Sequence, residues 1–170
     1  MKLFKNVFLV LLLSLAVVAC NKSDDDGGDG GDAAEGTVTA KVDGANFTSM
    51  SIATTAVQTS AGGTSTLRVQ GSDADGKGII LTIIGFDGTG SYNVGGGADI
   101  FTNAVYVEAN VSNPADSQSW MAPFDDTVAG EINVSEINET NVIGTFSFTG
   151  KNGNDDSTKA ITEGSFNANF

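Results

Sequence analysis

Oxygen-bearing side chains near the C-terminus have a spacing that could bind a metal ion. Asn152, Asn154 and Asp156 are each two residues apart, and Glu163 follows seven residues later. Calcium-binding loops place oxygen ligands at the first, third, fifth and twelfth positions, which is the spacing found here. The sixth position lacks the glycine of such loops, and oxygen-rich hairpin loops are usually turns. We therefore expect no resident cofactor, and calcium at these four residues remains the alternative.

Trp120 and Phe124 could form a second kind of site. Trp120 is the only tryptophan in the chain, and Phe124 follows four residues later. An aromatic ring offers a broad apolar face, which suits the stacking of a sugar ring. The other interpretation is that Trp120 belongs to the hydrophobic core. An exposed Trp120 beside a polar groove would favour ligand binding, whereas a buried Trp120 would favour a structural role.

The composition excludes much of enzyme chemistry. The chain has one cysteine and no histidine, so Ser-His and Cys-His nucleophile pairs, histidine zinc sites and an internal disulfide are impossible. The adjacent acids of the pairs 125–126 and 155–156 would point to opposite faces of a strand. Nothing therefore fixes two carboxylates across a cleft, as hydrolysis would require. We predict that the chain is not an enzyme, and a carboxylate-based hydrolase is the least favoured alternative.

The N-terminus has the pattern of a secretory signal. Lys2 and Lys5 precede the apolar run Val7–Val18, which is too short to span a bilayer comfortably. The segment Val17-Val18-Ala19-Cys20 resembles a bacterial lipobox. That resemblance implies that residues 1–19 are a signal peptide, that cleavage occurs before Cys20, and that its thiol receives diacylglycerol. Two or more acyl chains would hold the protein stably at a membrane.

The residues behind Cys20 indicate where the anchor is displayed. Lys22 and Ser23 precede Asp24, Asp25 and Asp26, and this order resembles the surface-export signal of Bacteroidota lipoproteins. The resemblance implies an outer-membrane lipoprotein exposed on the cell surface, and a solvated acidic linker is the alternative. Residues 27–36 contain no apolar side chain larger than alanine. Such a segment cannot bury a core, so we expect residues 20–36 to be a disordered tether before a single domain at 37–170.

The charge of the chain limits its partners. The formal net charge is −13, from 21 acidic and 8 basic residues. Such a surface repels phosphate backbones, so we expect no nucleic-acid partner. It also lacks a basic face for anionic lipid headgroups, so the lipid anchor is the expected contact with the membrane.

The domain that must position these residues reads as β-structure almost throughout. Apolar residues alternate with polar ones, and Gly-, Asn- and Asp-rich turns separate the segments. Ile79–Phe86 is nearly continuous in apolar residues, which predicts a central strand covered on both faces. We expect an all-β antiparallel sandwich or barrel-like domain of nine or ten short strands. The expected strands cover 37–42, 46–55, 66–70, 79–86, 91–94, 104–111, 117–122, 127–135, 141–149 and 160–170.

A glycine stands two residues before an aromatic at three places. The three segments are Gly90-Ser91-Tyr92, Gly144-Thr145-Phe146 and Gly164-Ser165-Phe166. Positions two apart in a strand share a face, so each glycine could leave room for an aromatic ring from the neighbouring strand. We interpret the pattern as a packing device rather than a repeat.

Several short motifs together resemble an uncharacterised family of Bacteroidota lipoproteins. The resemblance covers nearly all of residues 37–170, and it implies the fold and the location without implying any catalytic residue. The motifs are Val42-Asp43-Gly44 with Phe47, Ile83–Gly90, Ser119-Trp120, Gly130-Glu131-Ile132, Gly144–Phe148 and Ile161–Phe166.

These observations favour a membrane-anchored lipoprotein with a non-catalytic domain that binds a glycan or a protein. A structural envelope-associated domain without a small-molecule ligand is the alternative.

Overall fold

The computed structural model describes residues 32–97 and 102–170, and the structural statements below concern these residues. Cys20 and the predicted export signal at Lys22–Asp26 lie outside the described residues. None of the helices in the described part is long and apolar enough to cross a membrane. Two short 3-10 helices, η1 (Ser51–Ala53) and η2 (Pro114–Asp116), interrupt an otherwise all-β chain. The strands are β1 (Thr37–Val42), β2 (Ala45–Thr48), β3 (Thr54–Ala61), β4 (Thr64–Ser72), β5 (Lys77–Ile84), β6 (Gly90–Gly95), β7 (Thr102–Glu108), β8 (Gln118–Ala122), β9 (Val128–Ile137), β10 (Asn141–Lys151) and β11 (Thr158–Asn169).

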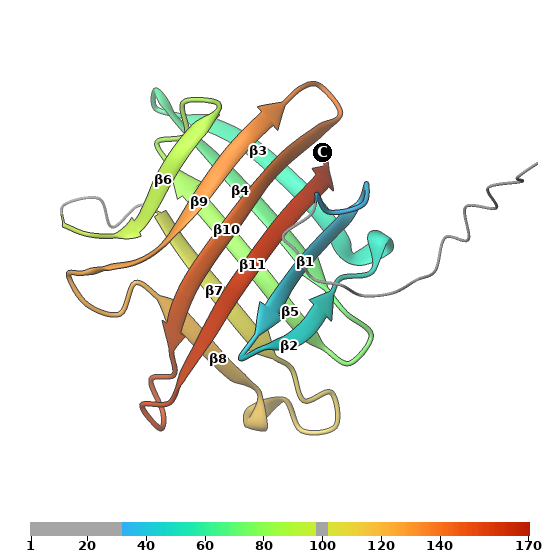
Figure 1. Ribbon diagram of the computed structural model, residues 1–170, viewed down its shortest axis with the longest axis vertical. Helices are drawn as coiled ribbons and strands as arrows, with labels where there is room; N and C mark the ends of the chain where they lie inside the picture. The colour runs from blue at the N-terminus through green and yellow to red at the C-terminus, as the bar shows by residue number, and fades with distance from the viewer. Residues whose placement is uncertain (1–31, 98–101) are drawn as a thin grey trace, which may run out of the picture.

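The eleven strands form one antiparallel sheet that curls into a half-barrel. The main path runs β2-β1-β11-β10-β8-β7-β5-β4-β3, and β9 pairs with both β10 and β6. Figure 1 shows two walls that cross each other: a front wall of β6, β9, β10, β11, β1 and β2, and a back wall of β8, β7, β5, β4 and β3. The walls join where Lys151 of β10 pairs with Met121 of β8. The prediction of an all-β, barrel-like antiparallel domain is confirmed.

The core fills the space between the two walls. Side chains alternate between the core and solvent along each strand, so Val38, Ala40 and Val42 of β1 are buried while the residues between them are partly exposed. The prediction that Ile79–Phe86 is covered on both faces is wrong. Ile79, Leu81 and Ile83 are buried, but Ile84 is 39% exposed, because no described segment forms a layer over the outer face of the back wall.

Two of the three glycine-aromatic motifs pack against each other on β10 and β11. Gly144 pairs with Phe166, and Phe146 pairs with Gly164. A Cβ on either glycine would strike the ring of the paired phenylalanine. The packing interpretation is therefore confirmed for these two motifs. It is wrong for Gly90, where a Cβ would meet nothing within 4 Å; its backbone φ of 149° is the feature that favours glycine.

The single extended segment expected at 46–55 is divided by η1. The chain crosses here from the front wall to the back wall, between β2 and β3. Ser49 stabilises the crossing because its Oγ accepts a hydrogen bond from the Val38 N–H at 2.8 Å. The Met50 N–H then donates to the Ser72 carbonyl at 2.9 Å. The crossing places β3 at the far edge of the sheet.

The domain begins before residue 37. Ala33 is buried at 5% exposure, and its N–H donates to Ser165 Oγ at 2.7 Å. The Gly36 N–H donates to the Asn167 carbonyl, also at 2.7 Å. Ser165 lies opposite the exposed Thr145, so its side chain is on the outer face of the front wall. Residues 33–36, which we call the N-terminal arm, therefore pack on the domain instead of belonging to a disordered tether.

Candidate functional site

Trp120 lies in the core. Its side chain is 6% exposed, and its ring centroid lies 5.7 Å from that of Tyr106, the residue opposite it on β7. Its indole N–H donates to Ser157 Oγ at 2.9 Å. The ring faces are therefore engaged by the protein, which is the core alternative that the sequence left open. Phe124 lies just beyond β8 and is 44% exposed, so it does not share an open platform with Trp120.

Charged side chains lie beside Trp120 at the end of the half-barrel that contains the β1–β2 turn. Lys159 Nζ lies 4.7 Å from the centroid of the Trp120 ring and forms ion pairs with Asp43 at 3.6 Å and Glu108 at 3.5 Å. The Tyr106 hydroxyl donates to Glu108 Oε1 at 2.9 Å. Burial, followed by this hydrogen bond and the nearby negative charges, raises the pKa of Tyr106 well above its usual range. We call Asp43, Tyr106, Glu108, Trp120 and Lys159 the closed end, because each charged side chain among them forms an ion pair with another.

The four calcium candidates do not come together as a set of ligands. Asn152 is buried, its Oδ1 accepts the Asn154 N–H at 2.8 Å, and its Nδ2 donates to Gln118 Oε1 at 2.8 Å. Asp156 forms an ion pair with Lys151 at 2.7 Å. Glu163 lies in the middle of β11 and forms an ion pair with Lys41 at 2.7 Å. Within 32–97 and 102–170, no three acidic or thiol side chains are grouped so that they could hold a metal ion.

The adjacent acids serve the turns that contain them. Asp125 Oδ1 accepts the Thr127 N–H at 2.9 Å and the Thr127 hydroxyl at 2.6 Å. Asp155 Oδ1 accepts the Ser157 N–H at 2.9 Å. These hydrogen bonds lower the pKa of both carboxyl groups. Both groups are therefore held ionised, which is the opposite of what a general acid requires.

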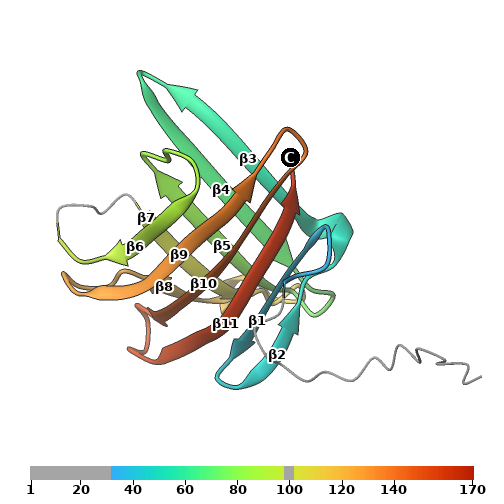
Figure 2. The same ribbon diagram turned by 45° about the horizontal axis from the view of Figure 1, so that its top comes forward.

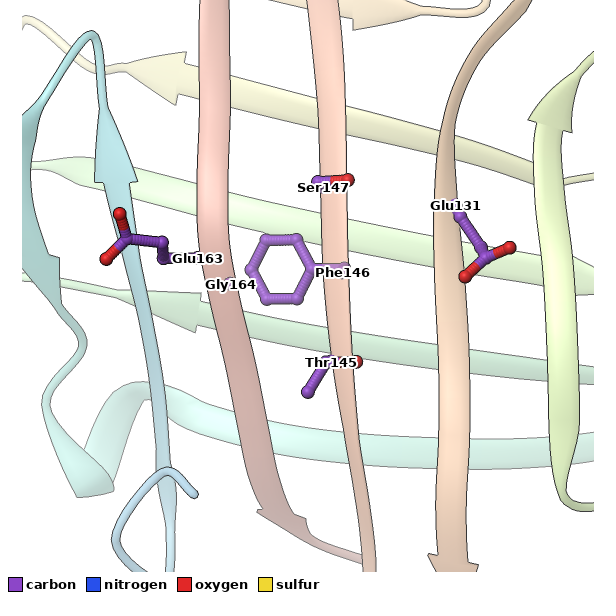
Figure 3. Close-up of a pocket in the computed structure, with 6 residues that line it drawn as sticks. All are labelled: Glu131, Thr145, Phe146, Ser147, Glu163 and Gly164. Atoms are coloured by element: carbon purple, nitrogen blue, oxygen red, sulfur yellow. The ribbon is translucent and has the colours of Figure 1, made fainter. Parts of the chain in front are cut away.

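A shallow groove of about 250 Å³ lies on the outer face of the front wall (Figure 3). A β-bulge sets its shape, because Thr162 and Glu163 of β11 together stand opposite the single residue Ser147 of β10. Figure 3 shows the carboxylates of Glu131 and Glu163 on opposite sides of the Phe146 ring, pointing away from each other. The groove thus holds two carboxylates that do not converge, and the hydrolase alternative gains no support from it.

A second groove lies on the outer face of the back wall, and we call it the outer groove. Its volume is about 530 Å³. Arg68 is the only arginine in the chain. It is exposed, and it forms no ion pair or hydrogen bond through its side chain with any other described residue. The lining contains no acidic residue and consists of Thr55, Val57, Thr59, Thr66, Arg68, Gln70 and Thr82.

A third groove, of about 600 Å³, opens at the end of the half-barrel opposite the closed end, and we call it the mouth groove. Figure 2 shows the β3–β4 hairpin and the β9–β10 turn at this same end of the half-barrel. Phe86 and Ile137 are the apolar residues of the lining. The rest of the lining is polar or glycine: Gln58, Ser60, Ser65, Asp87, Gly88, Asn138 and Glu139.

Sequence reasoning missed both grooves beside the β3–β4 hairpin. The outer groove depends on the register that sets Val57 of β3 and Thr82 of β5 on either side of Arg68. The available signal was the alternation of Thr66, Arg68 and Gln70 on one face of a strand in an otherwise acidic chain.

Comparison with protein families matches residues 34–168 to a domain described as a domain of unknown function, DUF6252. No match was found among curated proteins or among solved structures. The matched range begins inside the N-terminal arm, in agreement with the packing of that arm on β11.

Proposed function

The chain belongs to the DUF6252 family of domains of unknown function, and from that premise we propose a lipid-anchored binding protein. In this proposal Cys20 carries the lipid, the anchor lies in the outer membrane, and the half-barrel is exposed on the surface of a Bacteroidota cell. The domain binds a glycan or a protein without catalysing a reaction on it.

The observation that supports a binding role is the unpaired Arg68 in the outer groove. Lys159 and Lys151 both form ion pairs with carboxylates, whereas Arg68 meets none among the described residues. Its guanidinium offers five N–H donors in a fixed geometry. Four threonine hydroxyls and one glutamine amide surround it. These groups can hydrogen-bond a ligand, but none of them is a nucleophile paired with a base, as covalent catalysis needs.

The position of the N-terminal arm agrees with such a role. The arm lies on the outer face of the front wall, whereas the outer groove lies on the outer face of the back wall. A membrane tether would therefore leave from the side of the domain opposite the outer groove, where it leaves the groove accessible.

A structural envelope domain without a small-molecule ligand is the second candidate. The buried Trp120 and the fully paired closed end favour it, because they remove the aromatic platform that a sugar would use. The two candidates share the anchor and differ only in whether the grooves are occupied.

The anchor is tested with the full chain expressed in a Bacteroidota host. The wild type should partition into detergent, and its N-terminal peptide should carry acyl chains by mass spectrometry. The Cys20→Ser variant should lose both properties. Brief protease treatment of intact cells should remove the domain, and replacing Asp24, Asp25 and Asp26 by alanine should protect it. A water-soluble wild-type protein would overturn the anchor, and a protected wild type would overturn surface exposure.

Binding is tested with the full chain purified in detergent on a glycan array and on a peptide array. We expect a ligand whose binding falls in the Arg68→Gln variant. The Lys77→Gln variant is the matched control, since it removes one exposed cation from the neighbouring strand outside the groove lining. Absence of any ligand on both arrays would favour the structural candidate.

A further inference from the structure

The free edge of β3 lacks the features that normally protect the edge of a sheet. β3 ends the strand order, and β4 is its partner among the described strands. Its pairing with β4 is regular from Thr54 to Ala61, with no bulge, and the strand contains no charged residue and no proline. Native sheets usually protect edges with those three devices, since an open edge offers unpaired backbone groups to another chain.

The hairpin turn determines which backbone groups are free. Gly62 and Gly63 have φ values of 60° and 84°, and Ala61 pairs directly with Thr64 across them. Antiparallel ladders alternate between hydrogen-bonded and non-hydrogen-bonded pairs. Counting back from the turn, the N–H and C=O groups of Gln58 and Ser60 point away from β4. The open stretch of the edge starts at Val57, whose side chain is 48% exposed. It does not include Thr55, because the Thr55 hydroxyl lies 3.5 Å from the Asn169 carbonyl of β11.

Successive side chains of β3 line different grooves. Val57 and Thr59 line the outer groove, whereas Gln58 and Ser60 line the mouth groove. A strand added beside β3 would likewise place alternate side chains in the two grooves. On the outer side Arg68 stands opposite Val57, one strand spacing of about 4.8 Å from the edge strand. On the mouth side the added strand would meet Phe86 and Ile137.

We propose that β3 binds an extended polypeptide as an additional strand, with an acidic side chain of the ligand at Arg68 and an apolar one in the mouth groove. The inference rests on the proposed binding function, and it specifies a polypeptide, not a glycan, as the ligand. In strand addition the main-chain hydrogen bonds provide affinity, and the pockets for alternate side chains provide specificity.

Charge selects the acidic polypeptide over a second copy of this chain. A β3–β3 pair would bring together two strands without any acidic residue and would leave both Arg68 guanidinium groups unpaired.

The test measures the dissociation constant of a defined peptide by fluorescence anisotropy, with the full chain in detergent. The peptide has seven residues, alternates valine with threonine, and carries one glutamate in place of the central threonine. Replacing that glutamate by glutamine should weaken binding roughly two- to fivefold, the size of an exposed ion pair. The Arg68→Gln variant should bind both peptides equally, and the Lys77→Gln variant should still distinguish them.

The role of the backbone edge is tested from both partners. Gln58→Pro removes an outward N–H and should weaken binding about tenfold or more, whereas Gln58→Ala removes the same side chain but keeps the N–H and should weaken binding much less. Methylating alternate backbone nitrogens of the peptide gives the same test with an unchanged protein, in case the proline variant does not fold. One of the two methylated registers should lose binding and the other should keep it.

Three outcomes would overturn the inference. If the peptide does not bind while a glycan does, strand addition is wrong and the proposed binding function remains. If neither binds, both fail. If the chain sediments as a dimer that Gln58→Pro converts to a monomer, the occupant of β3 is a second copy and not a foreign polypeptide.

Discussion

Position 144 requires glycine, because the ring of Phe166 and the carbonyl of Asn133 occupy the space where a Cβ would lie. Gly144→Ala should therefore lower the free energy of unfolding by about 1–3 kcal/mol, the usual cost of overpacking a core. Urea unfolding followed by tryptophan fluorescence measures the change. Gly153→Ala is the matched control, since a Cβ there would meet nothing within 4 Å. Equal stability of the two variants would contradict the reciprocal packing of β10 and β11.

Tyr106 should couple the stability of the domain to alkaline pH. Its pKa is raised in the folded state, first by burial and then by the hydrogen bond to Glu108. Its contribution is therefore complete below the unfolded tyrosine pKa of about 10 and is lost as the pH rises above that value. In a Tyr92→Phe background, Tyr106 is the only tyrosine. Its tyrosinate absorbance should appear only together with unfolding measured by circular dichroism, and an earlier absorbance step would contradict the burial.

A β-bulge on β11 breaks the regular pairing of this strand with β10 and β1. Glu163 has a φ of 50°, a left-handed conformation that glycine and asparagine adopt readily and that β-branched residues avoid. We expect Glu163→Val to be less stable than Glu163→Asn by about 1–2 kcal/mol, because both remove the exposed ion pair with Lys41 but only valine strains the backbone. Thermal melts of the two variants at one pH make the comparison, and equal melting temperatures would contradict the bulge.

Strands with one buried face could be predicted from the sequence, and the strand at the free edge could not. β1 and β10 alternate between core and solvent along their length, and that alternation is visible in the residue types. β3 buries only Ala56, and five of its eight residues are exposed, so its sequence carries no periodic signal. η1 could not be foreseen either, because it depends on where the chain crosses between the walls.

The candidate sites followed the same division. The spacing from Asn152 to Glu163 matched a calcium loop, but spacing does not show that Asn152 Oδ1 is used by its own turn and that Glu163 lies on a bulge. Trp120 could be assigned to the core or to the surface only once β7 and β8 were paired. Arg68 gained significance from its neighbours on β3 and β5, which are fixed by register and not by sequence distance.

For the molecule as a whole, the arm sets where the stable domain begins. A chain that starts at residue 37 should be less stable than one that starts at residue 33, by about 2 kcal/mol, because it loses the burial of Ala33 and the hydrogen bonds that Ala33 and Gly36 donate to β11 and that Thr37 donates to Ala34. Ser165→Ala should cost more in the longer chain than in the shorter one, since Ser165 accepts its bond from the arm. Urea unfolding of the four proteins gives the coupling. Equal stabilities of the two chain lengths would contradict a packed arm.

Under the proposed lipid anchor, the arm would also supply extra length to the attachment. A pull toward the membrane would enter the domain through Ala33, and the bonds of Ala33 and Gly36 are the first it would load. Releasing these four residues would add about 13–14 Å of extended chain while β1 stays paired with β11. The domain could thus move away from its anchor point under load and return without unfolding its core.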